Sequence, residues 1–77
     1  MDFNRTKQKI REKLQYGDIA NLCREKNISR ETYNVAMSRD SYDELRVKER
    51  LIIGAALTLI KEREQEDARV KEIAESL

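Results

Sequence analysis

Residues 18–37 carry the pattern that most constrains how this chain can fold. Apolar residues recur at helical spacing on both sides of a short turn at residues 27–29, which predicts two amphipathic helices joined tightly. The inward positions are Ile19, Leu22 and Cys23 in the first helix, and Tyr33, Ala36 and Met37 in the second. Because free cysteine usually behaves as a small hydrophobe, we interpret Cys23 as a structural core thiol rather than a reactive one.

Residues typical of helix ends lie at the boundaries of both helices of this pair. Gly17 tolerates a positive φ and predicts the end of a preceding helix. Asp18 is expected to cap the first helix of the pair, and Ser29 the second. Ile28 and Tyr33 flank the Ser29 cap with the spacing of a hydrophobic staple, which fixes the angle at which the chain enters the second helix.

Composition extends the helical interpretation to the whole chain. The 77 residues contain no proline and two glycines, and they allow one domain with a small core. We therefore predict an all-α fold, a small helix-turn-helix bundle of about four helices with a long C-terminal helix. The first helix is expected to be capped by Asn4 or Thr6, to run to about Leu14, and to bury Phe3, Ile10 and Leu14.

The C-terminal half predicts the long helix. Residues 41–44 have the form of a capping box, in which the Glu44 side chain reaches back to the Ser41 backbone, and no strong breaker follows Tyr42. Gly54 is a poor helix former and is expected to mark a close packing contact. The inward residues of this helix are Leu45, Ile52, Ile53, Ala56, Leu57 and Ile60.

The end of the chain has a second apolar stripe after the polar residues 61–69. The stripe consists of Val70, Ile73, Ala74 and Leu77. The long helix therefore either continues past the core to meet a partner, or bends near Glu66 and folds back. We assign residues 1–64 to a helix-turn-helix DNA-binding domain and residues 65–77 to a helical extension that is a candidate dimerisation segment.

Charge is unevenly distributed along the chain. Sixteen basic and fifteen acidic residues give a net charge of +1. Residues 1–40 have nine basic and six acidic residues, which gives +3, and residues 41–77 have seven and nine, which gives −2. Basic side chains gather between Arg5 and Lys13. This pattern fits a polyanion bound on one side of the molecule, or simply a solvated helix face.

The chain lacks the residues that several classes of function require. The chain has one cysteine and no histidine, so neither an internal disulfide nor an ordinary zinc site is expected, and a cytoplasmic location fits. The longest apolar run, residues 51–57, is too short to cross a membrane. No Gly-rich phosphate loop and no Cys–His or Ser–His arrangement is present. We therefore expect no enzyme activity, no cofactor, no metal, no membrane partner and no small-molecule substrate.

The 18–37 segment resembles the helix-turn-helix of Cro and phage-repressor-type DNA-binding proteins, including small regulators of phages and mobile elements. In that family a small residue lies four positions before a glycine. Here Cys23 matches the small residue, with Ala20 as an alternative that lengthens the turn by three residues. Asn27 matches the glycine, and asparagine is the best substitute in a left-handed conformation. The family's later positions correspond to Ile28, Ser29, Thr32, Tyr33, Ala36 and Met37.

The resemblance implies a repressor-like transcriptional regulator that binds double-stranded DNA sequence-specifically through the helix at 29–38. Base contacts would come from the outer face of that helix: Arg30 to guanine, Asn34 to adenine, Glu31 to cytosine and Val35 to a thymine methyl. The implied contacts to the DNA backbone are Ser29, Thr32, Arg39, Lys7, Lys9 and Arg11. Each of these residues is alternatively an ordinary exposed side chain.

Repressors of this type gain affinity by dimerising on half-sites about 34 Å apart. We therefore expect a homodimer, although a tail that folds back within one chain is the alternative. The expected dimerisation residues are Ile53, Ala56, Leu57, Ile60, Val70, Ile73 and Leu77. The competing function is a helical protein-interaction module, an antirepressor or adaptor without DNA binding, which the mild net charge favours.

Overall fold

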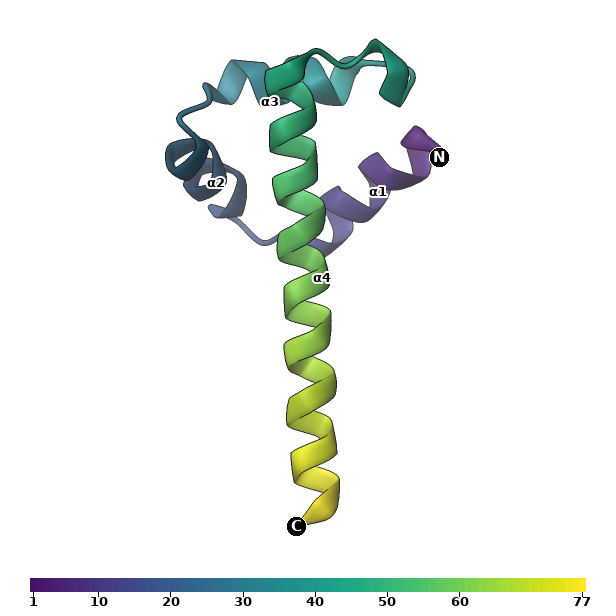
Figure 1. The fold of residues 1–77 in the computed structure, drawn as a ribbon, viewed down its shortest axis with the longest axis vertical. Coiled ribbons are helices and arrows are strands. Elements are labelled where there is room, and N and C mark those ends of the chain that lie inside the picture. Colours follow the sequence, from purple (N-terminus) through teal and green to yellow (C-terminus); the bar gives the residue numbers. More distant parts are fainter.

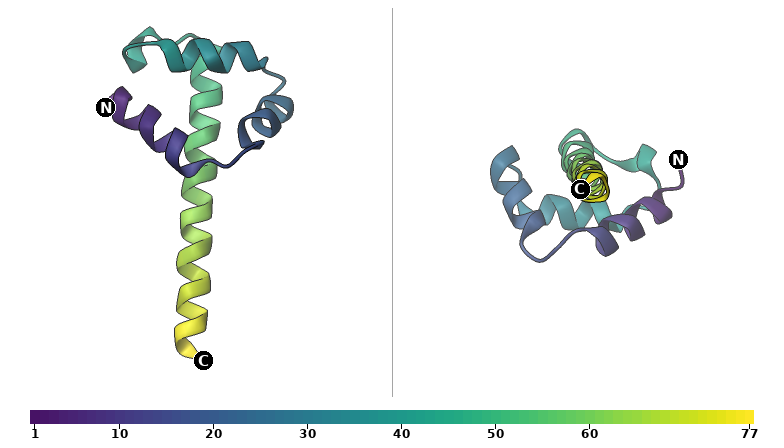
Figure 2. Two further views of the ribbon diagram at one scale, coloured as in Figure 1. Left: turned by 180° about the vertical axis from the view of Figure 1, so that it is seen from behind. Right: turned by 90° about the horizontal axis from the view of Figure 1, so that it is seen from below.

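The computed structural model describes all residues from 1 to 77 and is all-helical, which confirms the predicted fold class. Four α-helices and one 3₁₀ turn follow one another along the chain (Figure 1). Their bounds are α1 Phe3–Lys13, α2 Asp18–Lys26, α3 Arg30–Ser38, η1 Tyr42–Glu44 and α4 Val47–Ser76. Helices α1 to α3 form a head that packs around the first half of α4, and the second half of α4 projects from this head (Figures 1 and 2).

Helix α1 starts earlier than the sequence suggested. The side chain of Asp2 caps it by accepting hydrogen bonds from the backbone N–H groups of Asn4 and Arg5 at 3.1 and 3.3 Å. The predicted cap at Asn4 or Thr6 is therefore wrong, because Asp2 supplies the acceptor ahead of both residues. Phe3 and Ile10 are buried, as expected.

The start of α2 departs from the prediction in a way that matters for the site. Gly17 has a φ of +89°, in the left-handed region, but it caps α2 and does not end α1, whose C-cap is the extended Leu14. Asp18 is the first helical residue rather than the cap. Its carboxylate instead accepts a 2.6 Å hydrogen bond from the Gln15 backbone N–H and binds Arg63 of α4.

The turn between α2 and α3 has the predicted form. Asn27 adopts a left-handed conformation with φ of 54°, and the Ile28 N–H donates to the Cys23 carbonyl at 2.9 Å. The Ser29 hydroxyl oxygen accepts from the Thr32 N–H at 3.2 Å and so caps α3. This geometry selects Cys23, not Ala20, as the small residue before the turn. Ile28 is buried together with Tyr33, as the staple requires.

The segment before α4 is not the predicted capping box. Glu44 ends the 3₁₀ turn, and its carboxylate accepts from the Asp40 N–H at 3.3 Å rather than from Ser41. Leu45 and Arg46 are extended, so α4 begins at Val47. The extended stretch inserts the Leu45 side chain into the core, where it is 4% exposed, and burial of that side chain accounts for the break.

Helix α4 is continuous over 30 residues and does not fold back. Its first half supplies Ile52, Ile53, Ala56 and Ile60 to the core, which also holds the inward residues of the other helices. The molecule is consequently elongated, with extents of 47 × 27 × 19 Å. Despite the length of α4, no helix combines the length and apolar character needed to cross a membrane.

Candidate nucleic-acid interface

The predicted base-reading residues share the outer face of α3. Arg30, Glu31, Asn34 and Val35 are all exposed, whereas Tyr33, Ala36 and Met37 on the opposite face are buried. Their positions follow from helical geometry, because residues three and four apart lie on one face. The structure therefore presents the four predicted residues together to solvent on a helix whose other face is fixed in the core.

The side chain of Arg30 lies over the ring of Tyr33 on the same helix. The guanidinium carbon of Arg30 lies 5.8 Å from the centroid of the Tyr33 ring, a cation–π distance. Burial raises the pKa of the Tyr33 hydroxyl, and the positive charges of Arg11 and Arg30 oppose that rise. The charge of Arg11 at the end of α1 thus favours the ionised form of the Tyr33 hydroxyl, as the charge of Arg30 does. Tyr33 is both a core residue and a support for Arg30.

A hollow of about 500 Å³ lies beside the N-terminus of α3. Ser29 and Thr32, two predicted backbone contacts, line it, and their hydroxyl oxygens are 2.9 Å apart. Two further lining residues, Arg24 of α2 and Lys48 of α4, are exposed cations that the sequence analysis did not select. Their only sequence signal is charge, and Lys48 is distant from the turn along the chain.

Arg39, which was predicted to contact the DNA backbone, forms an ion pair within the chain. Its Nε donates to Oε1 of Glu49 at 2.9 Å, and its Nη2 lies 3.4 Å from Oε2. Glu49 is buried, and its hydrogen bond with Arg39 holds the pKa of this carboxyl below the ordinary value. Because Glu49 already pairs with the guanidinium, a DNA contact of Arg39 stays a prediction that this ion pair does not favour.

Lys7 and Lys9 also have partners within the chain. The Lys7 Nζ donates to the Arg39 carbonyl at 2.8 Å, at the C-terminal end of α3, where a cation is favourable. The Lys9 Nζ lies 3.8 Å from Glu64 of α4, with both side chains about half exposed. Such an exposed pair contributes little stability. Of the predicted α1 cations, Arg11 is the one whose charge acts on Tyr33 of α3.

Cys23 is part of the turn. It is 6% exposed, and its Sγ lies 3.9 Å from the Ser29 carbonyl oxygen, which accepts its hydrogen bond. Burial raises the pKa of the thiol. A buried thiol with a raised pKa is a poor nucleophile, which supports its interpretation as a structural residue.

The predicted dimerisation residues fall into two groups. Ile53, Ala56 and Ile60 are fully or almost fully buried by this chain's own helices. They cannot also form a seam with another molecule, and that part of the prediction is corrected. Leu57 is partly buried against the same core. In contrast, Val70, Ile73 and Leu77 are exposed on the projecting half of α4.

Comparisons of this chain with protein-family models, with curated proteins and with solved structures give no match.

Proposed function

We propose that this protein binds double-stranded DNA sequence-specifically through α3 and acts as a repressor-like transcriptional regulator that self-associates through its C-terminal helix. The observation that carries the proposal is the outer face of α3, where Arg30, Glu31, Asn34 and Val35 are exposed together after a capped helix-turn-helix turn. An α-helix fits the major groove, and side chains in its first turns reach base edges.

The four side chains offer complementary chemistry to base edges. The Arg30 fork can donate two hydrogen bonds to guanine, and the Asn34 amide can pair with adenine in the same bidentate manner. Glu31 can accept from the cytosine amino group, while Val35 packs on a thymine methyl. The cation–π contact with Tyr33 restricts Arg30, so less conformational freedom is lost on binding.

Phosphate contacts are assigned to the surroundings of the α3 N-terminus. Ser29 and Thr32 supply hydroxyls, and Arg24 and Lys48 supply positive charge in the adjoining hollow. Arg11 of α1, whose charge opposes the rise in the pKa of Tyr33, is a further candidate cation. These cations would supply positive charge to the phosphates although the whole chain has a net charge of only +1.

The test is selection of bound sequences from random duplex DNA, followed by binding measurements on the selected duplex. The double variant Arg30→Ala with Asn34→Ala is expected to abolish preference for that duplex. A matched control is Arg5→Ala with Asn4→Ala, which removes the same side-chain types from exposed positions of α1. Circular dichroism checks that both variants fold. No binding by the wild type at low salt, or equal binding by the wild type and the α3 variant, contradicts the proposal.

The second candidate is a helical protein-interaction module. The exposed apolar residues of the α4 tail favour it, because contiguous exposed apolar surface marks interaction sites. The two functions are separated by the selection experiment: an interaction module enriches no DNA sequence, and its α3 variant retains partner binding.

A further inference from the structure

Tyr16 lies in the loop between α1 and α2 and is the most exposed aromatic residue of the chain. Its side chain is 107% exposed, whereas Tyr33 is buried in the core and Tyr42 is partly buried against it. Neither hydrophobic burial nor ring packing stabilises the side chain of Tyr16 within the fold. The ring and its hydroxyl are therefore free to contact another molecule.

The loop holds the backbone of Tyr16 in a defined position. Two hydrogen bonds between Gln15 and Asp18 close a turn around it. The Asp18 N–H donates to the Gln15 carbonyl at 3.1 Å, and the Gln15 N–H donates to the Asp18 carboxylate at 2.6 Å. Gly17 supplies the left-handed conformation in this turn, and Arg63 of α4 binds the Asp18 carboxylate. Because the turn is formed before any ligand binds, little backbone freedom at Tyr16 is lost on binding.

The loop also shares a hollow with the first residue of α3. The hollow has a volume of about 250 Å³, and its lining includes the apolar side chains of Tyr16, Ile19 and Ala20 together with Arg30 of α3. Arg30 is the residue that the proposed function assigns to a guanine edge. Tyr16 thus lies beside the proposed base-reading face of α3 but outside the helix that would enter the groove.

The DNA strand at the edge of the major groove fits this position. The groove is about 12 Å wide, so a recognition helix inside it is flanked by sugar–phosphate strands. A residue beside the start of that helix, and not on it, meets a strand rather than a base edge. The hollow offers apolar side chains for a deoxyribose ring, and the Tyr16 hydroxyl offers a hydrogen-bond donor for a phosphate oxygen.

We propose that Tyr16 contacts the deoxyribose and phosphate of the DNA strand next to the guanine that Arg30 reads. The ring packs on the deoxyribose, and the hydroxyl donates a hydrogen bond to a phosphate oxygen. Such a contact fixes the position of α3 in the groove and carries no sequence information of its own. The inference rests on the proposed function, since it requires that α3 bind duplex DNA.

The first experiment removes only the hydroxyl. For Tyr16→Phe we expect binding to the selected duplex to weaken about tenfold, because a hydrogen bond to a charged group is lost. Selection with this variant should return the same base sequence as selection with the wild type, and an altered sequence contradicts a backbone contact. The matched control is Tyr42→Phe, which removes a hydroxyl from a ring that packs edge-on against Phe3 and should leave DNA binding unchanged.

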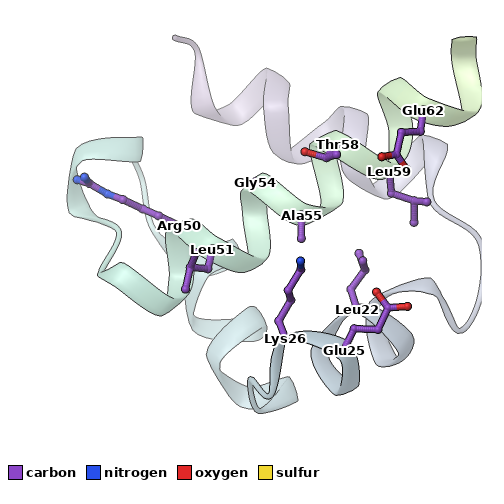
Figure 3. Close-up of a pocket in the computed structure, with 10 residues that line it drawn as sticks. All are labelled: Leu22, Glu25, Lys26, Arg50, Leu51, Gly54, Ala55, Thr58, Leu59 and Glu62. Atoms are coloured by element: carbon purple, nitrogen blue, oxygen red, sulfur yellow. The ribbon is translucent and has the colours of Figure 1, made fainter.

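The second experiment removes the ring as well. Tyr16→Ala should bind more weakly than Tyr16→Phe, because the contact with the deoxyribose is also lost. The control is Leu51→Ala, since Leu51 is 56% exposed and lines a separate groove between α2 and α4 (Figure 3). Circular dichroism checks that each variant folds. An equal loss of binding in Leu51→Ala overturns the specific role of Tyr16.

The third experiment locates the contact on the DNA. Each phosphate of the selected duplex is replaced in turn by a neutral methylphosphonate. Near the guanine whose preference is lost in Arg30→Ala, we expect one replacement that weakens the wild type but has little further effect on Tyr16→Phe, because both changes remove the same hydrogen bond.

The outcomes separate the two proposals. A wild type that binds no duplex overturns the proposed function and the Tyr16 contact with it. A wild type that binds the selected duplex no better than Tyr16→Phe does, or penalties that add at every phosphate, overturns the Tyr16 contact alone and leaves DNA binding by α3 intact.

Discussion

Asp18 at the start of α2 forms a bidentate ion pair with Arg63 of α4, with N–O distances of 2.6 and 2.8 Å, although 45 residues separate them. The Asp18 side chain is 11% exposed, and it also accepts a hydrogen bond from the Gln15 N–H. A bidentate pair fixes the orientation of both groups. The first residue of α2 is therefore held to Arg63, at the point where α4 leaves the head.

Asp18→Asn is expected to destabilise the fold. It removes the charge that organises Arg63 and Gln15, and a hydrogen bond to a charged group contributes about 1.5–3 kcal/mol. Because Arg63 is partly in water, we expect a loss of about 1–2 kcal/mol in the free energy of unfolding. Urea denaturation measures it. The control is Asp67→Asn, an exposed acidic residue of the tail, and equal stability of the two variants would contradict this role for Asp18.

Acid should weaken the fold through the same residue. The hydrogen bond with Arg63 lowers the pKa of Asp18 from 3.8 to about 2. The unfolded chain thus takes up this proton at a higher pH than the folded chain. The stability due to Asp18 is complete above about pH 4 and is lost as the pH falls toward 2. Denaturation between pH 5 and 2 should show a smaller pH dependence in Asp18→Asn than in the wild type; parallel curves would contradict the assignment.

The features predicted correctly from the sequence are those that neighbouring residues determine. The turn of the helix-turn-helix depends on Asn27, Ser29 and the Ile28–Tyr33 pair, all within seven residues, so local propensity was sufficient. The outer face of α3 followed from helical periodicity once the inward residues were recognised.

The features that were missed depend on partners distant in the sequence. Asp18 is a residue type typical of a cap, and only the folded chain shows that Arg63 binds it. Arg39 was expected to reach DNA because nothing in the sequence pairs it with Glu49. Gly54 was expected to pack closely, yet its neighbouring space is empty in the single chain. Ion pairs between distant residues and open grooves produce no periodic pattern in the sequence, so they cannot be predicted from it.

Arg39 and Lys48 should respond differently to alanine substitution. Arg39→Ala leaves the buried Glu49 carboxylate without its partner, so we expect reduced thermal stability.

Lys48→Ala is expected to leave the fold intact. It should also reduce the steepness of the plot of log K for DNA binding against log salt concentration by about 0.9, the contribution of one phosphate contact. Thermal melts and binding titrations at several salt concentrations test both variants. If the dependence of DNA binding on salt concentration is the same in Lys48→Ala as in the wild type, Lys48 does not contact phosphate.

The conformation of Asn27 yields the final prediction. Its φ of 54° lies in the left-handed region, which glycine adopts without a Cβ penalty and asparagine tolerates better than other residues. Asn27→Gly is therefore expected to keep or raise the free energy of unfolding, by up to about 1 kcal/mol, whereas Asn27→Ala lowers it by about 1 kcal/mol. Because the turn sets the position of α3, Asn27→Ala should also weaken DNA binding more than Asn27→Gly does. Urea denaturation with binding to the selected duplex measures both effects, and an alanine variant as stable as the glycine variant would show that the turn does not require this conformation.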